Sequence, residues 1–102
     1  MSYKIIRTDN FNDQLTDIIM YIRDTYSKKE ALEYLDYLEK EISNLKEFPY
    51  IGVVPRYLPI AKQGYRAIIC KQNIVFYKVN ESTKEIILNI IVSSKRNYLN
   101  LI

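Results

Sequence analysis

Apolar residues recur at helical spacing in the first half of the chain. Between residues 11 and 26 they fall three or four positions apart, and mainly charged or other polar side chains lie between them. This period is typical of an amphipathic helix, here about four turns long. The apolar positions of this first predicted helix are Phe11, Leu15, Ile18, Ile19, Ile22 and Tyr26.

A second helix is predicted to begin directly after the first. Ser27 and Glu30 have the spacing of a capping box, in which the serine accepts a hydrogen bond from an amide one turn into the helix. Pro49 forces this helix to end near Glu47 or Phe48. Its apolar positions form a coiled-coil-like seam of Ala31, Leu35, Leu38, Ile42 and Leu45. Because the connection is very short, an antiparallel hairpin is expected, although so regular a seam could instead mediate dimerisation.

The remaining apolar runs have the patterns of β-strands. They occupy residues 3–7, 65–71, 74–80 and 85–93. The last three runs are separated by hairpin-sized polar turns, which predicts an antiparallel meander.

The strand predicted at 85–93 is apolar on both faces. Strict alternation divides its side chains into two sets. One face is expected to carry Ile86, Leu88, Ile90 and Val92, and the other Ile87 and Ile91. Such a strand is predicted to be central in the sheet, or to be covered on its second face by a partner.

Residues 49–63 have no steady period. Three prolines and Gly52 interrupt them, which predicts a long loop from the helices to the sheet. Arg56 and Lys62 are expected to be exposed on this loop. Loops of this length in compact domains are often functional.

Together these elements predict one α+β domain over residues 1–102. The apolar stripe of the helical hairpin needs a cover, which the sheet can supply. We expect an N-terminal strand and an antiparallel helical hairpin packed on a mainly antiparallel four-stranded sheet. There is no signal-peptide core and no run of roughly 18 apolar residues, as a membrane span requires. With Cys70 as the single cysteine, the chain is predicted to be a soluble cytoplasmic protein without a membrane partner.

The net charge of +3 conceals an uneven distribution. Residues 1–48 carry seven Lys/Arg and ten Asp/Glu, whereas residues 49–102 carry eight Lys/Arg and two Asp/Glu. The half that contains most of the sheet is therefore basic. It could attract a polyanion or an acidic partner protein, and a solvated basic face without a ligand is the alternative.

The chain contains no histidine, which excludes imidazole as a general base, metal ligand or triad member. No glycine-rich phosphate loop or inward pair of carboxylates is evident either, so no metal and no cofactor is expected. What remains is a set of cations interleaved with tyrosines: Arg66, Lys71, Lys78, Lys95 and Arg96 with Tyr65, Tyr77 and Tyr98. Such side chains can hold phosphates and stack on bases, or they can serve ordinary packing.

The order and spacing of several short segments resemble the RelE/ParE superfamily of bacterial type II toxins. The resemblance rests on LKEFPYIG, GYRAII, NIVFYKVN and the closing IILNIIVSSKRNYLNLI, and it covers nearly the whole chain. It implies a growth-inhibiting toxin encoded beside a small antitoxin that wraps around it. One branch of the superfamily cleaves messenger RNA in the ribosome, and another inhibits DNA gyrase. Operator DNA would be contacted only through the antitoxin.

Two residues match basic positions of the superfamily's nucleases. Arg66 matches a position on the second strand, and Arg96 matches the arginine that follows the last strand. If the chain is a ribonuclease, the resemblance makes Arg66, Arg96 and Tyr98 the catalytic candidates. The residues expected to bind the target or the antitoxin are Arg56, Arg66, Tyr77, Lys95, Arg96 and Tyr98.

Other nuclease positions are not filled. The strand-three arginine of the nucleases falls near Asn73 or Ile74, Ser93 stands where a histidine is frequent, and the C-terminal catalytic tyrosine falls near Ile102. Loss of a general acid or base typically costs on the order of 10² to 10⁴ in rate. The comparison therefore favours the gyrase-inhibitor branch, or a binding toxin with no chemistry of its own. Ribosome-dependent messenger RNA cleavage is the alternative, and a purely structural or housekeeping role is the least favoured.

Overall fold

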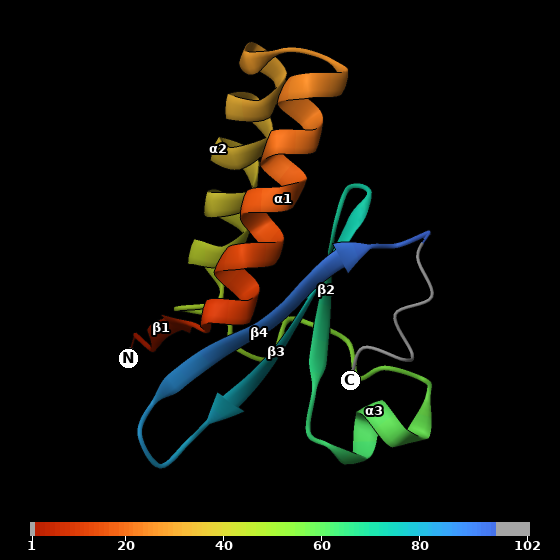
Figure 1. Cartoon of the computed structure of the whole chain (residues 1–102). Coiled ribbons are helices and arrows are strands. Elements are labelled where there is room, and N and C mark those ends of the chain that lie inside the picture. The colour runs from red at the N-terminus through yellow and green to blue at the C-terminus, as the bar shows by residue number, and fades with distance from the viewer. Residues whose placement is uncertain (1, 96–102) are drawn as a thin grey trace.

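A pair of long helices stands over one face of a four-stranded sheet (Figure 1). The computed structural model describes residues 2–95 of the chain. The elements are β1 (Lys4–Arg7), α1 (Asp9–Thr25), α2 (Lys28–Asn44), α3 (Leu58–Lys62), β2 (Arg66–Cys70), β3 (Asn73–Asn80) and β4 (Glu85–Ser93). The α+β class and the helical hairpin predicted from the sequence are confirmed.

Hydroxyl side chains start both long helices. The Thr8 side chain accepts a hydrogen bond from the Phe11 amide at 3.1 Å at the start of α1. Ser27 accepts one from the Glu30 amide at 3.1 Å at the start of α2, as predicted. Each bond satisfies one of the amides that lack a partner within the first turn of a helix.

The helical hairpin buries its apolar stripe against the sheet. Phe11 and Leu15 of α1 pack with α2 residues and with β3 and β4 in one core. The residues of α2 and its C-terminal end that are buried there are Tyr34, Leu38, Ile42 and Leu45. The predicted seam is therefore used largely within the chain, which argues against the dimerisation alternative. None of the helices in residues 2–95 is long and apolar enough to cross a membrane.

The sheet has the order β1-β4-β3-β2. The pairs β2–β3 and β3–β4 are antiparallel, and β1 lies parallel to β4. The sheet is thus mixed, and the predicted central position of β4 is confirmed. The first hairpin turn consists of Lys71 and Gln72, one residue earlier than predicted, because Cys70 pairs with Asn73.

A β-bulge corrects the predicted faces of β4. Phe76 pairs with Ile90 and Tyr77 pairs with Leu88, so Asn89 is an extra residue in the ladder. An extra residue reverses the alternation of side chains beyond it. Leu88 and Ile91, predicted on opposite faces, consequently pack in the same helix-facing core. The predicted set was wrong beyond Asn89, since Ile90 and Val92 pack in a second core.

That second core involves a helix that the sequence analysis missed. Residues 49–63 were predicted to be a loop, but they contain α3 and a backbone bridge between Val53 and Ala67. Ile60 of α3 is 1% exposed and packs in the second core, with Ala67 among its members. A helix of five residues is too short to display a period, which is why the pattern did not reveal it.

Candidate functional site

A buried tyrosine fastens the segment between α2 and α3 to the sheet. The Tyr77 hydroxyl donates to the Pro49 carbonyl oxygen at 2.8 Å and accepts from the Gly52 amide at 3.0 Å. Burial raises the pKa of this hydroxyl, so it remains protonated. Tyr77 is 0% exposed, and a side chain without exposed surface cannot contact a partner. Its place in the predicted binding set is therefore corrected to that of an internal anchor.

Arg66 of β2 is engaged with the same segment. Its Nη1 atom donates to the Gly52 carbonyl oxygen at 2.9 Å, and its guanidinium carbon lies 4.8 Å from the centre of the Tyr50 ring. The side chain is half-buried. A guanidinium that already serves a backbone carbonyl and an aromatic ring has fewer donors free for a phosphate.

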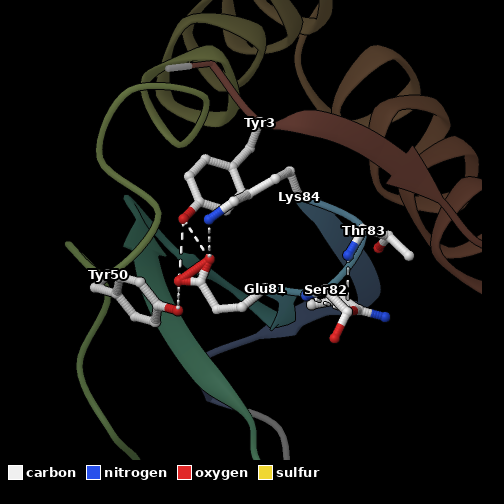
Figure 2. Close-up of polar contacts among 7 residues, drawn as sticks. Tyr3, Tyr50, Glu81, Ser82, Thr83 and Lys84 are labelled. Carbon is white, nitrogen blue, oxygen red and sulfur yellow. Dashed lines mark hydrogen bonds and ion pairs between the residues drawn. The ribbon is translucent and has the colours of Figure 1, made fainter.

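A carboxylate on the turn between β3 and β4 joins three separate parts of the chain (Figure 2). Glu81 accepts hydrogen bonds from the hydroxyls of Tyr3 at 2.5 Å and Tyr50 at 2.6 Å. The Lys84 ammonium donates to the same carboxylate at 3.1 Å. We call Tyr3, Tyr50, Glu81 and Lys84 the Glu81 cluster. It ties the start of the chain and the segment after α2 to a single turn.

The hydrogen bonds of this cluster stabilise the ionised carboxylate. The bonds from Tyr3, Tyr50 and Lys84 lower the pKa of Glu81 from 4.5 to about 2. The bond to Glu81 raises the pKa of Tyr50 from 10.0 to about 12, because loss of the proton would place two negative charges side by side. Near neutral pH the acceptor is charged and both phenols are protonated, the arrangement that gives the strongest hydrogen bonds here.

Acidification is expected to release the Glu81 cluster only at low pH. Because the folded pKa of about 2 lies below the ordinary 4.5, the contribution of this carboxylate to stability is present above pH 4.5 and is lost as the pH falls toward 2. An NMR titration of the Glu81 carboxyl carbon measures this directly, and Tyr50→Phe should move the midpoint upward. An ordinary midpoint in the wild-type protein would contradict the expectation.

The segment held by Tyr77, Arg66 and Glu81 exposes several large apolar side chains to solvent. Each of them is more than half exposed. We call this set the apolar ridge: Phe48, Ile51, Val53, Val54 and Leu58. Clusters of exposed apolar side chains on a soluble protein often mark an interaction site.

Besides a hollow of about 390 Å³ between β1 and α2, two hollows lie beside the meander of β2, β3 and β4. One, of about 230 Å³, is at the edge of β2, where Ile51 and Val53 of the apolar ridge line it together with Ile69. The other, of about 280 Å³, lies between α1 and the ends of β3 and β4, with Tyr21 and Tyr26 on its wall. Both are open enough to accept side chains of a partner. Only the first borders the apolar ridge.

Three of the cations that alternate with tyrosines in the sequence lie over tyrosine rings, although only Lys78 does so over a tyrosine of the same set. Lys71 Nζ lies 4.4 Å from the centre of the Tyr37 ring, and Lys78 Nζ lies 4.5 Å from that of Tyr65. Arg66 lies over Tyr50 in the same way. Cation–π contacts at such distances stabilise the folded chain. Arg66, Lys71 and Lys78 therefore have internal aromatic partners.

Of the other predicted binding residues, two are exposed and two lie outside the described residues. Arg56 is exposed in the stretch that carries the apolar ridge, and Lys95 is exposed just beyond β4. Arg96 and Tyr98 lie outside the residues that the structure describes. Of the predicted catalytic set, only Arg66 can therefore be placed.

The strand-three position to which the resemblance assigns an arginine is buried in this chain. Asn73 is 7% exposed, and its side-chain amide donates to the Tyr34 hydroxyl at 2.8 Å. Ile74 is also buried, and Ser93 is half-buried at the end of β4. Within residues 2–95, no group of histidine, cysteine and acidic side chains could hold a metal ion.

Sequence reasoning missed the Glu81 cluster. Glu81 was assigned only to a polar turn, and its phenol partners lie 78 and 31 residues away along the chain. No local spacing joins such positions. The available signal was weak: Glu81 is one of only two acidic residues in the basic half of the chain.

Comparisons with known proteins agree on one kind of system. Among solved structures, the chain is similar to a chromosomal ParDE toxin-antitoxin system from P. aeruginosa, with 17% identity, a TM-score of 0.74, and 90% of this chain and 96% of that one covered. It is also similar to the RelBE2 toxin-antitoxin complex of Mycobacterium tuberculosis, with 11% identity and a TM-score of 0.62, over 91% and 99% of the two chains. At these identities the likeness establishes the fold.

No curated protein matches the chain. The family described as ParE toxin of type II toxin-antitoxin system, parDE, matches residues 5–98. That range includes the helical hairpin, the segment that carries the apolar ridge, and the whole meander. The chain therefore belongs to the ParE toxin family of type II toxin-antitoxin systems.

Proposed function

We propose that this toxin arrests growth by binding DNA gyrase and carries out no chemistry of its own. The observation that carries the proposal is that the side chains at two positions used by the nucleases are already engaged within the chain. Asn73 is buried beneath Tyr34, and Arg66 is bonded to the backbone of Gly52. Cleavage of RNA needs accessible groups that donate and accept protons, whereas a binding inhibitor needs a complementary surface. Exposed apolar and cationic side chains supply such a surface.

A cognate antitoxin protein is proposed to keep the toxin inactive in the cytoplasm. The family assignment and the two solved toxin-antitoxin relatives support this partner. Acidic residues of the antitoxin would complement exposed cations of the basic half, with Arg56 and Lys95 as accessible candidates and Arg96 and Tyr98 retained from the sequence. Operator DNA would be reached only through the antitoxin.

A ribosome-dependent messenger RNA endonuclease is the second candidate function. It is supported by the fold shared with the RelBE2 complex and by the position of Arg66 on β2. Under this alternative, Arg66 and Arg96 would stabilise the charge that develops on the cleaved phosphate. Replacing either by alanine would then abolish the cuts.

Purified toxin is expected to inhibit supercoiling by DNA gyrase, while translated messages stay intact after induction. Arg56→Ala combined with Lys95→Ala should raise the inhibitory concentration roughly tenfold, because exposed cations contribute to association with an acidic partner. Lys28→Ala combined with Lys29→Ala, at the start of α2, is the matched control and should have little effect. Supercoiling assays and mapping of transcript ends measure the two activities.

Two results would contradict this function. Undiminished supercoiling at a large excess of toxin would exclude gyrase as the target. Cuts in translated messages within minutes of induction, abolished by Arg66→Ala, would establish the nuclease alternative.

A further inference from the structure

The apolar ridge is held in place from several sides. Beneath it, the Tyr77 hydroxyl binds the backbone of Pro49 and Gly52. Val53 exchanges two backbone hydrogen bonds of 2.9 Å with Ala67 on β2. At its start, the Tyr50 hydroxyl binds the Glu81 carboxylate, and Figure 2 shows Tyr3 and Tyr50 approaching that carboxylate from two different segments. A segment fixed in this way loses little conformational freedom on binding.

The charged residues of the segment that carries the apolar ridge have one sign, and the exposed Glu47 directly precedes Phe48. Residues 48–80 contain five Lys/Arg and no Asp/Glu. Three of these cations lie over tyrosine rings, whereas Arg56 and Lys62 are exposed. Glu41 of α2 lines the hollow beside Ile51 and Val53, and Glu81 is bound within its cluster. The free charges of the segment itself therefore favour carboxylates on the opposing surface.

We propose that the apolar ridge is a preformed docking surface for an apolar, carboxylate-rimmed surface of the protein target, and that Glu81 is the positioning residue that fixes it. The proposal rests on the proposed function, in which the toxin acts by binding a protein. Branched aliphatic side chains such as Ile51, Val53 and Val54 gain by burial against other apolar groups. A nucleic acid would instead select cations and exposed aromatic faces, so a protein fits this surface better.

The first experiment tests contact. Ile51→Asp and Ile51→Ser change an exposed side chain, so the fold should persist, and thermal melts verify it. Binding to purified DNA gyrase is expected to weaken roughly tenfold or more for Ile51→Asp, and less for Ile51→Ser. Growth arrest after induction should be lost in parallel. Leu32→Asp, on an exposed apolar position of α2, is the matched control and should retain both activities.

The outcomes separate the surface from the identity of the target. If Ile51→Asp binds gyrase as tightly as the wild type does, the apolar ridge is not the docking surface. If wild-type toxin does not bind gyrase, the proposed target is wrong, and growth arrest becomes the test of the docking surface. Loss of growth arrest in Ile51→Asp would then support the docking surface. Growth arrest that is retained in Ile51→Asp, or that is absent from the wild type, would contradict it. Binding of an RNA or duplex DNA probe that Ile51→Asp abolishes would also overturn it, because the occupant would then be a nucleic acid.

The second experiment tests positioning. Tyr50→Phe and Glu81→Ala are expected to speed amide hydrogen exchange between residues 50 and 54 roughly tenfold in the free toxin, with little change in the global melting temperature. Target binding or growth arrest should also weaken in both variants. Glu81→Gln, whose amide oxygen can still accept a hydrogen bond from a phenol, should restore part of the protection from exchange and part of the activity. Asp24→Asn, which removes the exposed ion pair with Arg23, and Tyr26→Phe are controls.

A merely structural role of Glu81 would give a different result. Stability and exchange would then change across the whole chain, and binding would follow the folded fraction. Unchanged exchange between residues 50 and 54 in Glu81→Ala, or faster exchange with full activity, would show that Glu81 does not position the surface.

Discussion

Replacing Gly52 with alanine is expected to lower the free energy of unfolding by about 3 kcal/mol, because there is no room for a methyl group. An added Cβ would lie 2.5 Å from the Tyr77 hydroxyl oxygen and 2.9 Å from the Ala67 carbonyl oxygen. To make space, the Tyr77 ring or the segment must move, which breaks the bonds of that hydroxyl to Pro49 and Gly52. Urea denaturation measures the loss.

Gly64→Ala is the matched control for this substitution. No heavy atom lies within 4 Å of its added Cβ, but its φ of +86° is unfavourable for a side chain. Backbone strain alone should cost about 1 to 2 kcal/mol. Equal losses for the two variants would contradict the steric account of Gly52. A loss of growth arrest in Gly52→Ala protein that remains folded would further support the role of the apolar ridge.

Replacing Leu88 with alanine is expected to destabilise the chain by about 2 to 5 kcal/mol. Leu88 is 0% exposed and lies on the central strand, in the core that joins the sheet to the helical hairpin. Truncation removes buried apolar surface and leaves a cavity that rigid neighbours on both layers cannot fill. The difference in the urea midpoint between the variant and the wild type reports the effect.

Ile87→Ala, one position earlier on β4, tests the assignment of faces. Ile87 lies on the other face of the strand and is only half-buried, so its truncation should cost about 1 kcal/mol. An Ile87→Ala variant less stable than Leu88→Ala would show that the faces of β4 are assigned the wrong way round.

Much of the fold could be predicted because local signals agree with the final structure. Ser27 begins α2 by its spacing to Glu30, and the polar turns of the meander separate strands that pair as neighbours. These features depend on residues close together in the chain. The bulge at Asn89 could not be predicted, since it exists only where β4 must match the side-chain positions of β3.

The candidate site was predicted less well than the fold. Arg66 was placed correctly on β2, but the sequence could not show that its guanidinium serves Gly52 and Tyr50. Tyr77 was predicted to bind a partner, and it is instead buried beneath the segment that carries the apolar ridge. The alternation of tyrosine with Lys and Arg suggested a surface for nucleic acid, whereas these side chains largely pair within the chain.

The sequence by itself determined the two long helices, the four strands, their order and the family, because periodicity, caps and turns are properties of neighbouring residues. Only the tertiary structure decided which tyrosines are anchors and which side chains remain exposed. It brought Tyr3, Tyr50 and Glu81 together from three distant segments and left Ile51 and Val53 exposed to solvent. The physical reason is that hydrogen bonding and burial depend on distances in space, which are set only when the helical hairpin, the sheet and the segment between them have packed together.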